Sequence, residues 1–446
     1  MEANSTLLAY YGDDLTGSTD VMEALASQGV DTVLFLKIPD AELFSRFRDR
    51  RAFGLAGTSR SETPEWMEKH LVPAFSWLKS LDAAFVHYKV CSTFDSSPKI
   101  GNIGKAIEIG RDMFGAQKVP LVVGAPQIRR YTAFGNLFAA YGAEIFRIDR
   151  HPVMSRHPVT PMDEADLRLH LANQTSLRTG LVNLVQLRSP QADSLVDAAF
   201  AGDEEIVLLD VDGDETQQLA GAQMWRKRDP AGQFTCGSSG IEYALMREWT
   251  RLGIAGTPQD FSSPGPVDRL AIVSGSVSPT TERQIRHALD NGFRGIALDP
   301  LEISAENADA AIAIAVEQGL KIVGSGESVI LYTALGPSTN RGDAISFSDN
   351  SRHRLGENLG NILREIVVGA GLKRAVIAGG DTSSHALAKL GVEALTLRLP
   401  LPQTPGSPLC TAYSTDPRID GMLVALKGGQ VGGDDYFSMI RAGGPA

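Results

Sequence analysis

Short hydrophobic runs alternate with amphipathic stretches in the first half of the chain. The run at 7–11 (LLAYY) predicts a buried strand, the pattern over 21–28 predicts a helix, and 32–36 predicts a second strand. Further strands are expected at 52–56, 85–90, 119–123, 180–184 and 206–211, with helices at 66–81, 105–114, 163–173 and 241–252. Strands that alternate with helices in this way predict a doubly wound parallel sheet.

The same pattern starts again after a segment rich in proline, glycine and serine, TPQDFSSPGPV at 257–267. Strands are expected at 270–273, 295–298, 329–333, 374–378 and 423–426, with helices at 280–291, 305–318, 356–369 and 385–390. A chain of 446 residues exceeds what one hydrophobic core supports, so we interpret 257–267 as a linker. We therefore expect an α/β fold with two domains, 1–256 and 268–446, each built on a mostly parallel sheet flanked by helices.

Composition limits the partners. The net charge of −11 argues against nucleic acid or an anionic membrane as the main partner. Cys91, Cys236 and Cys410 show neither a disulfide framework nor metal-ligand spacing, which favours a reducing cytoplasm. The first residues lack the features of a signal peptide, and no stretch is apolar enough to cross a bilayer. We expect a cytoplasmic protein, and the sequence is compatible with a homodimer.

The loop after the first strand contains two adjacent carboxylates, in the motif DDLTGSTD at 13–20. A helix-capping role for Asp14 or Thr16 explains one carboxylate but not both. Paired aspartates at a strand end suit general-base chemistry, hydroxyl recognition or Mg²⁺ positioning. Asp13 and Asp14 are therefore candidate functional residues.

The stretch 85–107 joins a strand, the polar loop CSTFDSSP at 91–98 and the start of a helix. Lys89 supplies a cation at the end of the strand, and the free N–H groups at a helix start favour an anion. The serines and threonine of the loop could instead only cap the helix. A lysine, several hydroxyls and a carboxylate in one short loop favour ligand binding over that alternative.

Other strand-end loops bring polar residues to the same edge, because parallel strands end on one edge of their sheet. The residues expected there are Asp13, Asp14, Arg60, Lys89, Ser92, Thr93, Asp95 and Arg129. Cations suit a carboxylate, and Asp, Ser and Thr suit hydroxyls, so the set fits a small polyhydroxylated acid. The proline-rich segment 147–162 predicts an ordered loop, whose histidines and arginines are as compatible with a structural role as with an anion contact.

Three loops of the second domain are rich in glycine and serine: SGSVS at 274–278, GGDTSS at 379–384 and KGGQVGG at 427–433. Glycines let the backbone approach a ligand, and free N–H groups and hydroxyls suit phosphate. The 379–384 loop contains neither GxxxxGK[ST] nor GxGxxG, and it could merely reverse the chain. Three such loops on one sheet edge favour a nucleotide site.

Together these motifs resemble the four-carbon acid sugar kinase family, the ATP-dependent kinases of threonate, erythronate and 3-oxo-tetronate. The matching stretches are DDLTGSTD at 13–20, KVCSTFDSSPKIGNIG at 89–104, SRHPVTPM at 155–162, CGSSG at 236–240, VSGSVS at 273–278, AGGDTS at 378–383 and KGGQVGGDDYF at 427–437. The chain departs from the family pattern at Ser155 to His157, at Lys99 to Gly101, at Asp381 in place of the commoner Glu and at Gly428 in place of Ser. These departures bear on the substrate and not on the class.

The resemblance implies a substrate-binding N-terminal domain, a nucleotide-binding C-terminal domain and an active site in the cleft between them. It implies ATP and Mg²⁺ as cofactors and a sugar acid as substrate, with Asp13 or Asp14 deprotonating or orienting the attacking hydroxyl. The expected acid contacts are Arg60, Lys89, Ser92, Thr93, Asp95 and His157, and the expected ATP contacts are Ser274, Ser276, Gly379, Gly380, Asp381, Thr382 and Gly429. No metal ligand is assigned.

Two other classes remain open from the sequence alone. A sugar-acid oxidoreductase would use a similar α/β scaffold, but the missing GxGxxG counts against it. A non-catalytic sensor would bind the acid and leave ATP untouched.

Overall fold

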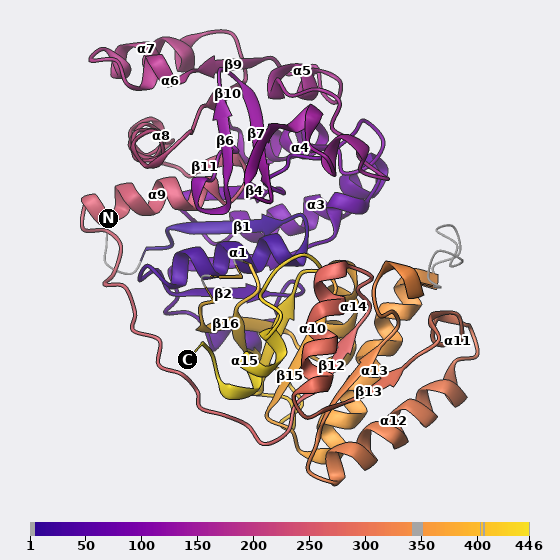
Figure 1. Ribbon diagram of the computed structural model, residues 1–446. Coiled ribbons are helices and arrows are strands. Elements are labelled where there is room, and N and C mark those ends of the chain that lie inside the picture. Colours follow the sequence, from indigo (N-terminus) through magenta and orange to yellow (C-terminus); the bar gives the residue numbers. More distant parts are fainter. Residues whose placement is uncertain (1–4, 341–350, 402, 405, 446) are drawn as a thin grey trace. The chain divides into compact units, whose positions relative to one another are not determined.

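The computed structural model describes residues 5–340, 351–401, 403–404 and 406–445, except for the side chains of Asp381 and Thr382. The chain divides into two compact units, Met1–Gln259 and Asp260–Ala446. Both are of the mixed α/β class, as the alternation of strands and helices predicts (Figure 1). The predicted location of an active site between two domains stays a prediction.

The first unit contains one parallel sheet. Its strands, in spatial order, are β2 (Thr32–Phe35), β3 (Ala52–Ala56), β1 (Leu8–Gly12), β4 (Phe85–Lys89), β11 (Gln233–Gly237), β5 (Val119–Val122), β10 (Ile206–Leu209) and β9 (Thr179–Val182). The strand ends are in register, because Lys89 pairs with both Gly12 and Gly237, and Gly237 pairs with Val122. We call this end of the sheet the carboxyl edge of the first unit.

Helices cover both faces of this sheet. Helices α1 (Leu15–Ala26), α8 (Asp214–Lys227) and α9 (Gly240–Arg251) pack together on one face, and α3 (Pro64–Lys79) and α4 (Ile103–Phe114) pack together on the other. The apolar positions Ile103, Ala106 and Ile107 of α4 recur with helical spacing and are buried. Gly110 continues this face, where an added Cβ would lie 2.0 Å from the Phe234 ring, so only glycine lets α4 approach β11 this closely.

Shorter helices and a small second sheet complete the first unit. The helices are α2 (Ala41–Ser45), α5 (Leu167–Ala172), α6 (Leu184–Leu187) and α7 (Ala192–Ala201). The sheet is antiparallel and consists of β6 (Arg130–Ala133), β7 (Asn136–Tyr141) and β8 (Glu144–Arg147). These three strands were not predicted from the sequence. The proline-rich segment after β8 forms an ordered loop with two short 3₁₀ turns, η3 (Ile148–Arg150) and η4 (Met154–Arg156).

The sheet of the second unit is mostly parallel. Its strands, in order, are β13 (Phe293–Ala297), β14 (Ser328–Tyr332), β12 (Ala271–Ser274), β15 (Arg374–Ala378), β18 (Leu423–Lys427), β17 (Leu409–Tyr413) and β16 (Ala394–Leu399). Strand β17 runs antiparallel to both of its neighbours. The strands β12, β13, β14, β15 and β18 were predicted from the sequence, whereas β16 and β17 were not.

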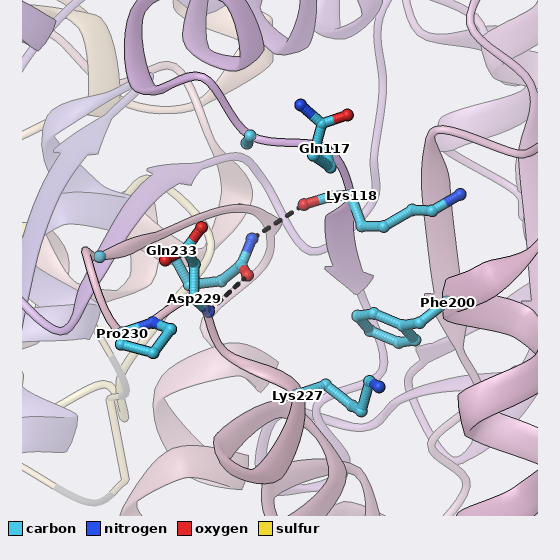
Figure 2. A pocket seen from close by; sticks show the side chains of 9 residues that line it. Gln117, Lys118, Phe200, Lys227, Asp229, Pro230 and Gln233 are labelled. Atoms are coloured by element: carbon cyan, nitrogen blue, oxygen red, sulfur yellow. Dashed lines mark hydrogen bonds between the residues drawn. The ribbon is translucent and has the colours of Figure 1, made fainter.

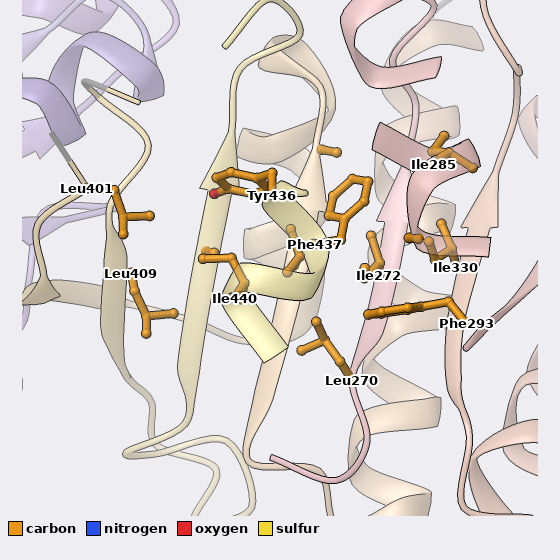
Figure 3. Packing of buried hydrophobic residues seen from close by; sticks show 14 of the residues in the cluster. Leu270, Ile272, Ile285, Phe293, Ile330, Leu401, Leu409, Tyr436, Phe437 and Ile440 are labelled. Carbon is orange, nitrogen blue, oxygen red and sulfur yellow. The ribbon is translucent and has the colours of Figure 1, made fainter. Parts of the chain in front are cut away.

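Two helices, α10 (Pro279–Asp290) and α15 (Tyr436–Ala442), seal one face of this sheet. Ile285, Tyr436, Phe437 and Ile440 pack there against alternate residues of the strands, among them Ile272 (Figure 3). The remaining helices are α11 (Pro300–Ser304), α12 (Asp309–Gly324), α13 (Ser351–Ala370) and α14 (Gly380–Leu390), and α12 to α14 pack side by side. Among the described residues, no helix is long and apolar enough to cross a membrane.

Candidate functional site

Three loops of the first unit are tied together at the carboxyl edge. The N–H of Asp13, just beyond β1, donates to the carbonyl oxygen of Lys89 at 2.9 Å, and the N–H of Arg60 donates to the carbonyl oxygen of Asp13 at 3.2 Å. The predicted residues Asp13, Asp14, Arg60 and Lys89 therefore lie close together. Their proximity follows from the parallel register, which ends β1, β3 and β4 on one row.

Asp13 is the unusual carboxyl group of this cluster. Its side chain is buried, and its Oδ1 atom has no hydrogen-bond partner among the described residues. Burial, followed by the nearby charge of Asp14, raises the pKa of Asp13 to about 7, although Arg60 and Lys89 oppose this shift. A carboxylate with a pKa near neutrality is suited to accept a proton from a substrate hydroxyl.

Asp14 has a different environment from Asp13. Its Oδ1 accepts the N–H of Gly17 at 2.6 Å, which caps α1, and its Oδ2 accepts Nη1 of Arg60 at 2.8 Å. Both oxygens are therefore engaged, one in the capping role and one in an ion pair. The arrangement separates the two aspartates, since Asp14 orients its neighbours and Asp13 keeps a free oxygen.

Arg60 also binds the polar loop after β4. Its Nη2 donates to both carboxylate oxygens of Asp95, at 3.0 Å each. Thr93 donates its hydroxyl to Asp95 Oδ1, and Thr160 donates to Oδ2 at 3.1 Å. Burial alone would raise the pKa of Asp95, but the Arg60 charge and the Thr93 hydrogen bond outweigh it and lower that pKa.

The 91–98 loop is fixed by the buried Phe94 side chain and by hydrogen bonds between Ser96 and residues of a distant segment. Phe94 is buried and adopts a left-handed backbone conformation, with φ of 56°. The Ser96 hydroxyl lies 2.8 Å from His170 Nε2 and accepts Nε2 of Gln174 at 2.8 Å. Ser92 is half-buried, and within the described residues its hydroxyl makes no side-chain hydrogen bond, so it is open to a ligand.

Lys89 and His157, both expected to contact the acid, have protein partners. Nζ of Lys89 is buried and donates to the carbonyl oxygen of Val90 at 2.8 Å. Burial lowers the pKa of Lys89, but Asp13, Asp20 and Asp14 outweigh it and raise that pKa. Nδ1 of His157 accepts the N–H of Thr160 at 3.1 Å and thus joins the Asp95 network.

Two further residues near this site were not predicted from the sequence: Thr160, which donates to Asp95, and Asp20, which acts on the pKa of Lys89. Thr160 lies in SRHPVTPM and Asp20 is the last residue of DDLTGSTD, so both residues could have been selected from the motifs that match the family. Arg129 is exposed and donates to the carbonyl oxygens of Gly142 and Ala143, at 2.6 and 3.2 Å. The structure therefore corrects the expectation that Arg129 joins the other cations of the carboxyl edge.

The second unit brings its three glycine- and serine-rich loops together. Ser274 pairs with Ala378, and Ala378 pairs with Lys427, so the three loops follow one row of strand ends. The N–H of Gly379 donates to the carbonyl oxygen of Lys427 at 2.9 Å, and Gly379 has a φ of 125° that favours glycine.

Helix α14 begins at Gly380, five residues before the expected start at 385. The backbone of 380–382 therefore forms the first helical turn, where N–H groups are free to bind an anion. The side chains of Asp381 and Thr382 lie outside the described residues.

One carbonyl oxygen joins two of these loops. Gly429 O accepts hydrogen bonds from Ser278 Oγ, from Thr281 Oγ1 at 3.1 Å and from Lys427 Nζ at 3.5 Å. Ser276 Oγ also lies 2.9 Å from Thr281 Oγ1. The hydroxyls of the 274–278 loop therefore fix the turn that follows β18.

Lys427 is a buried cation that the sequence analysis did not single out. Its Nζ donates to Thr281 Oγ1 at 2.9 Å and to the carbonyl oxygen of Gly428 at 2.8 Å. It forms no ion pair within the described residues, and burial lowers its pKa to about 7. The lysine therefore holds the turn through neutral acceptors.

A cavity of about 290 Å³ lies elsewhere in the first unit (Figure 2). It is lined by Lys118 and Gln233, which stand where β5 and β11 begin, so it lies at the opposite edge of the sheet. Nζ of Lys118 donates to two carbonyl oxygens, and Lys227 pairs with Asp197 at 3.0 Å. The two lysines that line this cavity therefore already have protein partners. The cavity is separate from the predicted site.

Comparison with known proteins identifies the family. Residues 8–245 match a family model described as a sugar-binding N-terminal domain, and residues 271–437 match a nucleotide-binding C-terminal domain. A 3-oxo-isoapionate kinase from Paraburkholderia graminis is 44% identical over 98% of this chain and 94% of its own length. The chain belongs to the four-carbon acid sugar kinase family. A 3-oxo-tetronate kinase from Cupriavidus necator, 27% identical over 98% of this chain and 96% of its own, is a more distant relative.

Solved structures agree on the fold. A Salmonella typhimurium LT2 protein aligns over 98% of both chains with a TM-score of 0.77 and 22% identity, and a Haemophilus influenzae protein aligns over 96% of this chain and 98% of its own with a TM-score of 0.72 and 23% identity. The four-carbon acid sugar kinase family has ATP-dependent members that act on sugar acids, and the kinase class predicted from the motifs is confirmed. The comparisons give no support to an oxidoreductase or to a non-catalytic sensor.

Proposed function

We propose that this kinase phosphorylates a hydroxyl of a 3-oxo sugar acid of the isoapionate or tetronate type. The main support is the 44% identity to a 3-oxo-isoapionate kinase over nearly the whole of both chains. The 3-oxo-tetronate kinases are less similar, at 25% to 28% identity. We therefore expect 3-oxo-isoapionate to be a better substrate than the linear four-carbon acids.

In this proposal Asp13 deprotonates or orients the attacking hydroxyl. Its unpartnered buried oxygen and its raised pKa support this role, whereas both oxygens of Asp14 are engaged. Asp14, Arg60 and Asp95 then act as positioning residues that hold the 91–98 loop. Ser92 and Thr93 offer hydroxyls to the substrate, and His157 and Lys89 support the same loop electrostatically.

The nucleotide is proposed to bind the second unit. Its contacts would be Ser274, Ser276, Gly379, Gly380, Asp381, Thr382 and Gly429, which line or follow one row of strand ends. Phosphoryl transfer depends mainly on positioning and on neutralising charge, which backbone N–H groups at the start of α14 supply in part. Lys427 keeps the Gly428–Gly429 turn in place.

Mg²⁺ is proposed to enter with ATP. No group of three or more His, Cys, Asp and Glu residues that could hold a metal occurs in the part of the chain that the structure describes. Mg²⁺ usually keeps several waters and binds substrate phosphates with one or two carboxylates. When bound, the ion neutralises charge on the transferring phosphoryl group.

The proposal is tested by coupled detection of ADP release with Mg-ATP. The acid panel contains 3-oxo-isoapionate, 3-oxo-tetronate, threonate and erythronate, with ADP release in the absence of any acid as the background. Turnover that is highest with a 3-oxo acid supports the proposal. No turnover with any acid, while ATP still raises the melting temperature, would contradict the proposed substrate class.

A further inference from the structure

The first unit offers a sugar acid little free positive charge at the predicted contacts. Arg60 is bound by Asp14 and by both oxygens of Asp95. Lys89 is buried among Asp13, Asp14 and Asp20, which act on its pKa. A negatively charged substrate therefore needs another cation, because carboxylates already outnumber the cations of this cluster.

Arg130 is placed to supply that charge. It is the first residue of β6, and two backbone hydrogen bonds, of 2.9 and 3.1 Å, pair it with Ala125. Ala125 follows the end of β5 by three residues, and Val122 at that end shares a row with Gly237 and Lys89. Adjacent strands lie about 4.8 Å apart, so Val122 and Lys89 lie roughly 10 Å apart, and Arg130 follows the β5 end of this row.

The guanidinium of Arg130 lacks a counter-charge. Nη1 donates to the carbonyl oxygens of Ile128 and Arg129, at 3.1 and 3.2 Å, while Nε is buried without a partner. Among the described residues, no carboxylate lies within ion-pair distance of it. Its electrostatic neighbours are the Cys91 thiol of the 91–98 loop, the Arg129 guanidinium and the Tyr131 hydroxyl, and it acts in turn on His151.

We propose that Arg130 binds the carboxylate of the sugar-acid substrate. The inference rests on the proposed function and adds the residue that recognises the acid group. The Cys91 thiol, in the same loop as the proposed hydroxyl contacts, is among the groups that act on the pKa of Arg130. Its neighbour Arg129 is exposed and bonded to the β7–β8 turn, and Arg156 is exposed, so neither is a partly buried cation like Arg130.

A purely structural role for Arg130 predicts a different outcome. Its two bonds to the 128–129 turn would then matter for the fold alone, and a substitution would weaken charged and uncharged substrates equally. A carboxylate contact instead predicts a loss that depends on the charge of the substrate. The two roles are separated by a neutral analogue of the same acid.

The test compares the wild type with Arg130→Gln, Arg130→Lys and the control Arg129→Gln. For each protein, kcat/KM is measured with the best acid of the panel and with its primary amide, and KM for ATP is measured as well. We expect Arg130→Gln to lower kcat/KM for the acid roughly 10- to 100-fold, the usual effect of losing a charged hydrogen bond, and to leave the amide and KM for ATP unchanged. Arg130→Lys should retain part of the preference for the acid, and Arg129→Gln should resemble the wild type.

Two results would overturn the inference: an unchanged kcat/KM for the acid in Arg130→Gln, or equal losses for the acid and the amide. Melting temperatures of the variants identify a folding defect. If Arg130→Gln has one, the ratio of kcat/KM for the acid to kcat/KM for the amide in Arg130→Lys distinguishes a carboxylate contact from a structural role. Failure of the proposed function has a different signature, since the wild type itself would then turn over no acid of the panel.

Discussion

The N–H of Asp13 donates to the carbonyl oxygen of Lys89 at 2.9 Å, and their buried side chains shift each other's pKa. The carboxylate favours the charged lysine, and the lysine partly offsets the effect of burial on the carboxyl group. This pair connects the ends of β1 and β4 and places a carboxyl group with a pKa near neutrality beside the 91–98 loop.

Replacement of Asp13 should remove most of the activity. Asp13→Asn keeps the shape of the side chain but cannot accept a proton, so we expect kcat to fall by about 10²- to 10⁴-fold. Asp14→Asn is the matched control, because it keeps the capping oxygen and loses only the charge that pairs with Arg60. Steady-state kinetics of both variants checks this, and near-wild-type turnover in Asp13→Asn would exclude the role.

Activity should depend on pH through Asp13. The raised pKa, about 7, predicts that kcat/KM falls as the pH drops below about 7, because the protonated carboxyl group cannot act as a base. Stability should show the opposite trend. The folded state binds this proton more tightly than the unfolded chain, so the stabilising contribution is complete below pH 3.8 and is lost as the pH rises to about 7. Rate profiles and urea titrations of the wild type and Asp13→Asn measure both, and identical profiles would contradict the assignment.

Lys427 should couple stability of the second unit to pH in the basic range. Its lowered pKa, about 7, means that the folded state binds the proton less tightly than the unfolded chain, whose lysine titrates near 10.5. Stability from this group therefore rises between about pH 7 and 10.5. Denaturant titrations at pH 7 and 9 should show a smaller rise in Lys427→Met than in the wild type.

The same variant should bind ATP more weakly, because the turn at Gly428 and Gly429 loses the ammonium that holds both carbonyl oxygens. Calorimetric titration of ATP measures this effect. Wild-type affinity in Lys427→Met would show that the lysine does not order the turn.

Gly17 should be intolerant of a side chain. An added Cβ would lie 2.6 Å from Lys89 Nζ and 2.7 Å from Asp14 Oδ1, so Gly17→Ala should lower the free energy of unfolding by about 1–3 kcal/mol. Gly324, also in a helix, has nothing within 4 Å of its added Cβ, and Gly324→Ala should be neutral or stabilising by about 0.5–1 kcal/mol. Denaturant unfolding of both variants tests the contrast, which equal effects would refute.

Much of the fold follows from local sequence patterns. Apolar runs such as 374–378 alternate with amphipathic helices, and β15 has those bounds in the structure. Parallel strands that end on one edge bring their loops together, so the proximity of Asp13, Arg60 and Lys89 was predictable without coordinates. Strands β16 and β17 and the β6–β8 sheet were missed because no helix separates β16 from β17, or the strands of the small sheet from one another, so the alternation of strands and helices does not mark them.

By itself, then, the sequence determined the α/β class, the mostly parallel sheets whose strand-end loops share one edge, and the kinase family. These depend on local patterns and on motifs that hold many residues in a fixed spacing. Only the tertiary structure decided which groups are free to act. Asp13 and Asp14 are adjacent residues of the same type. Asp13 has an unpartnered buried oxygen, whereas Asp14 caps a helix and pairs with Arg60. Arg129 and Arg130 are likewise adjacent, yet Arg129 is exposed and donates to the β7–β8 turn, whereas Arg130 is half-buried and donates to the carbonyl oxygens of its own turn.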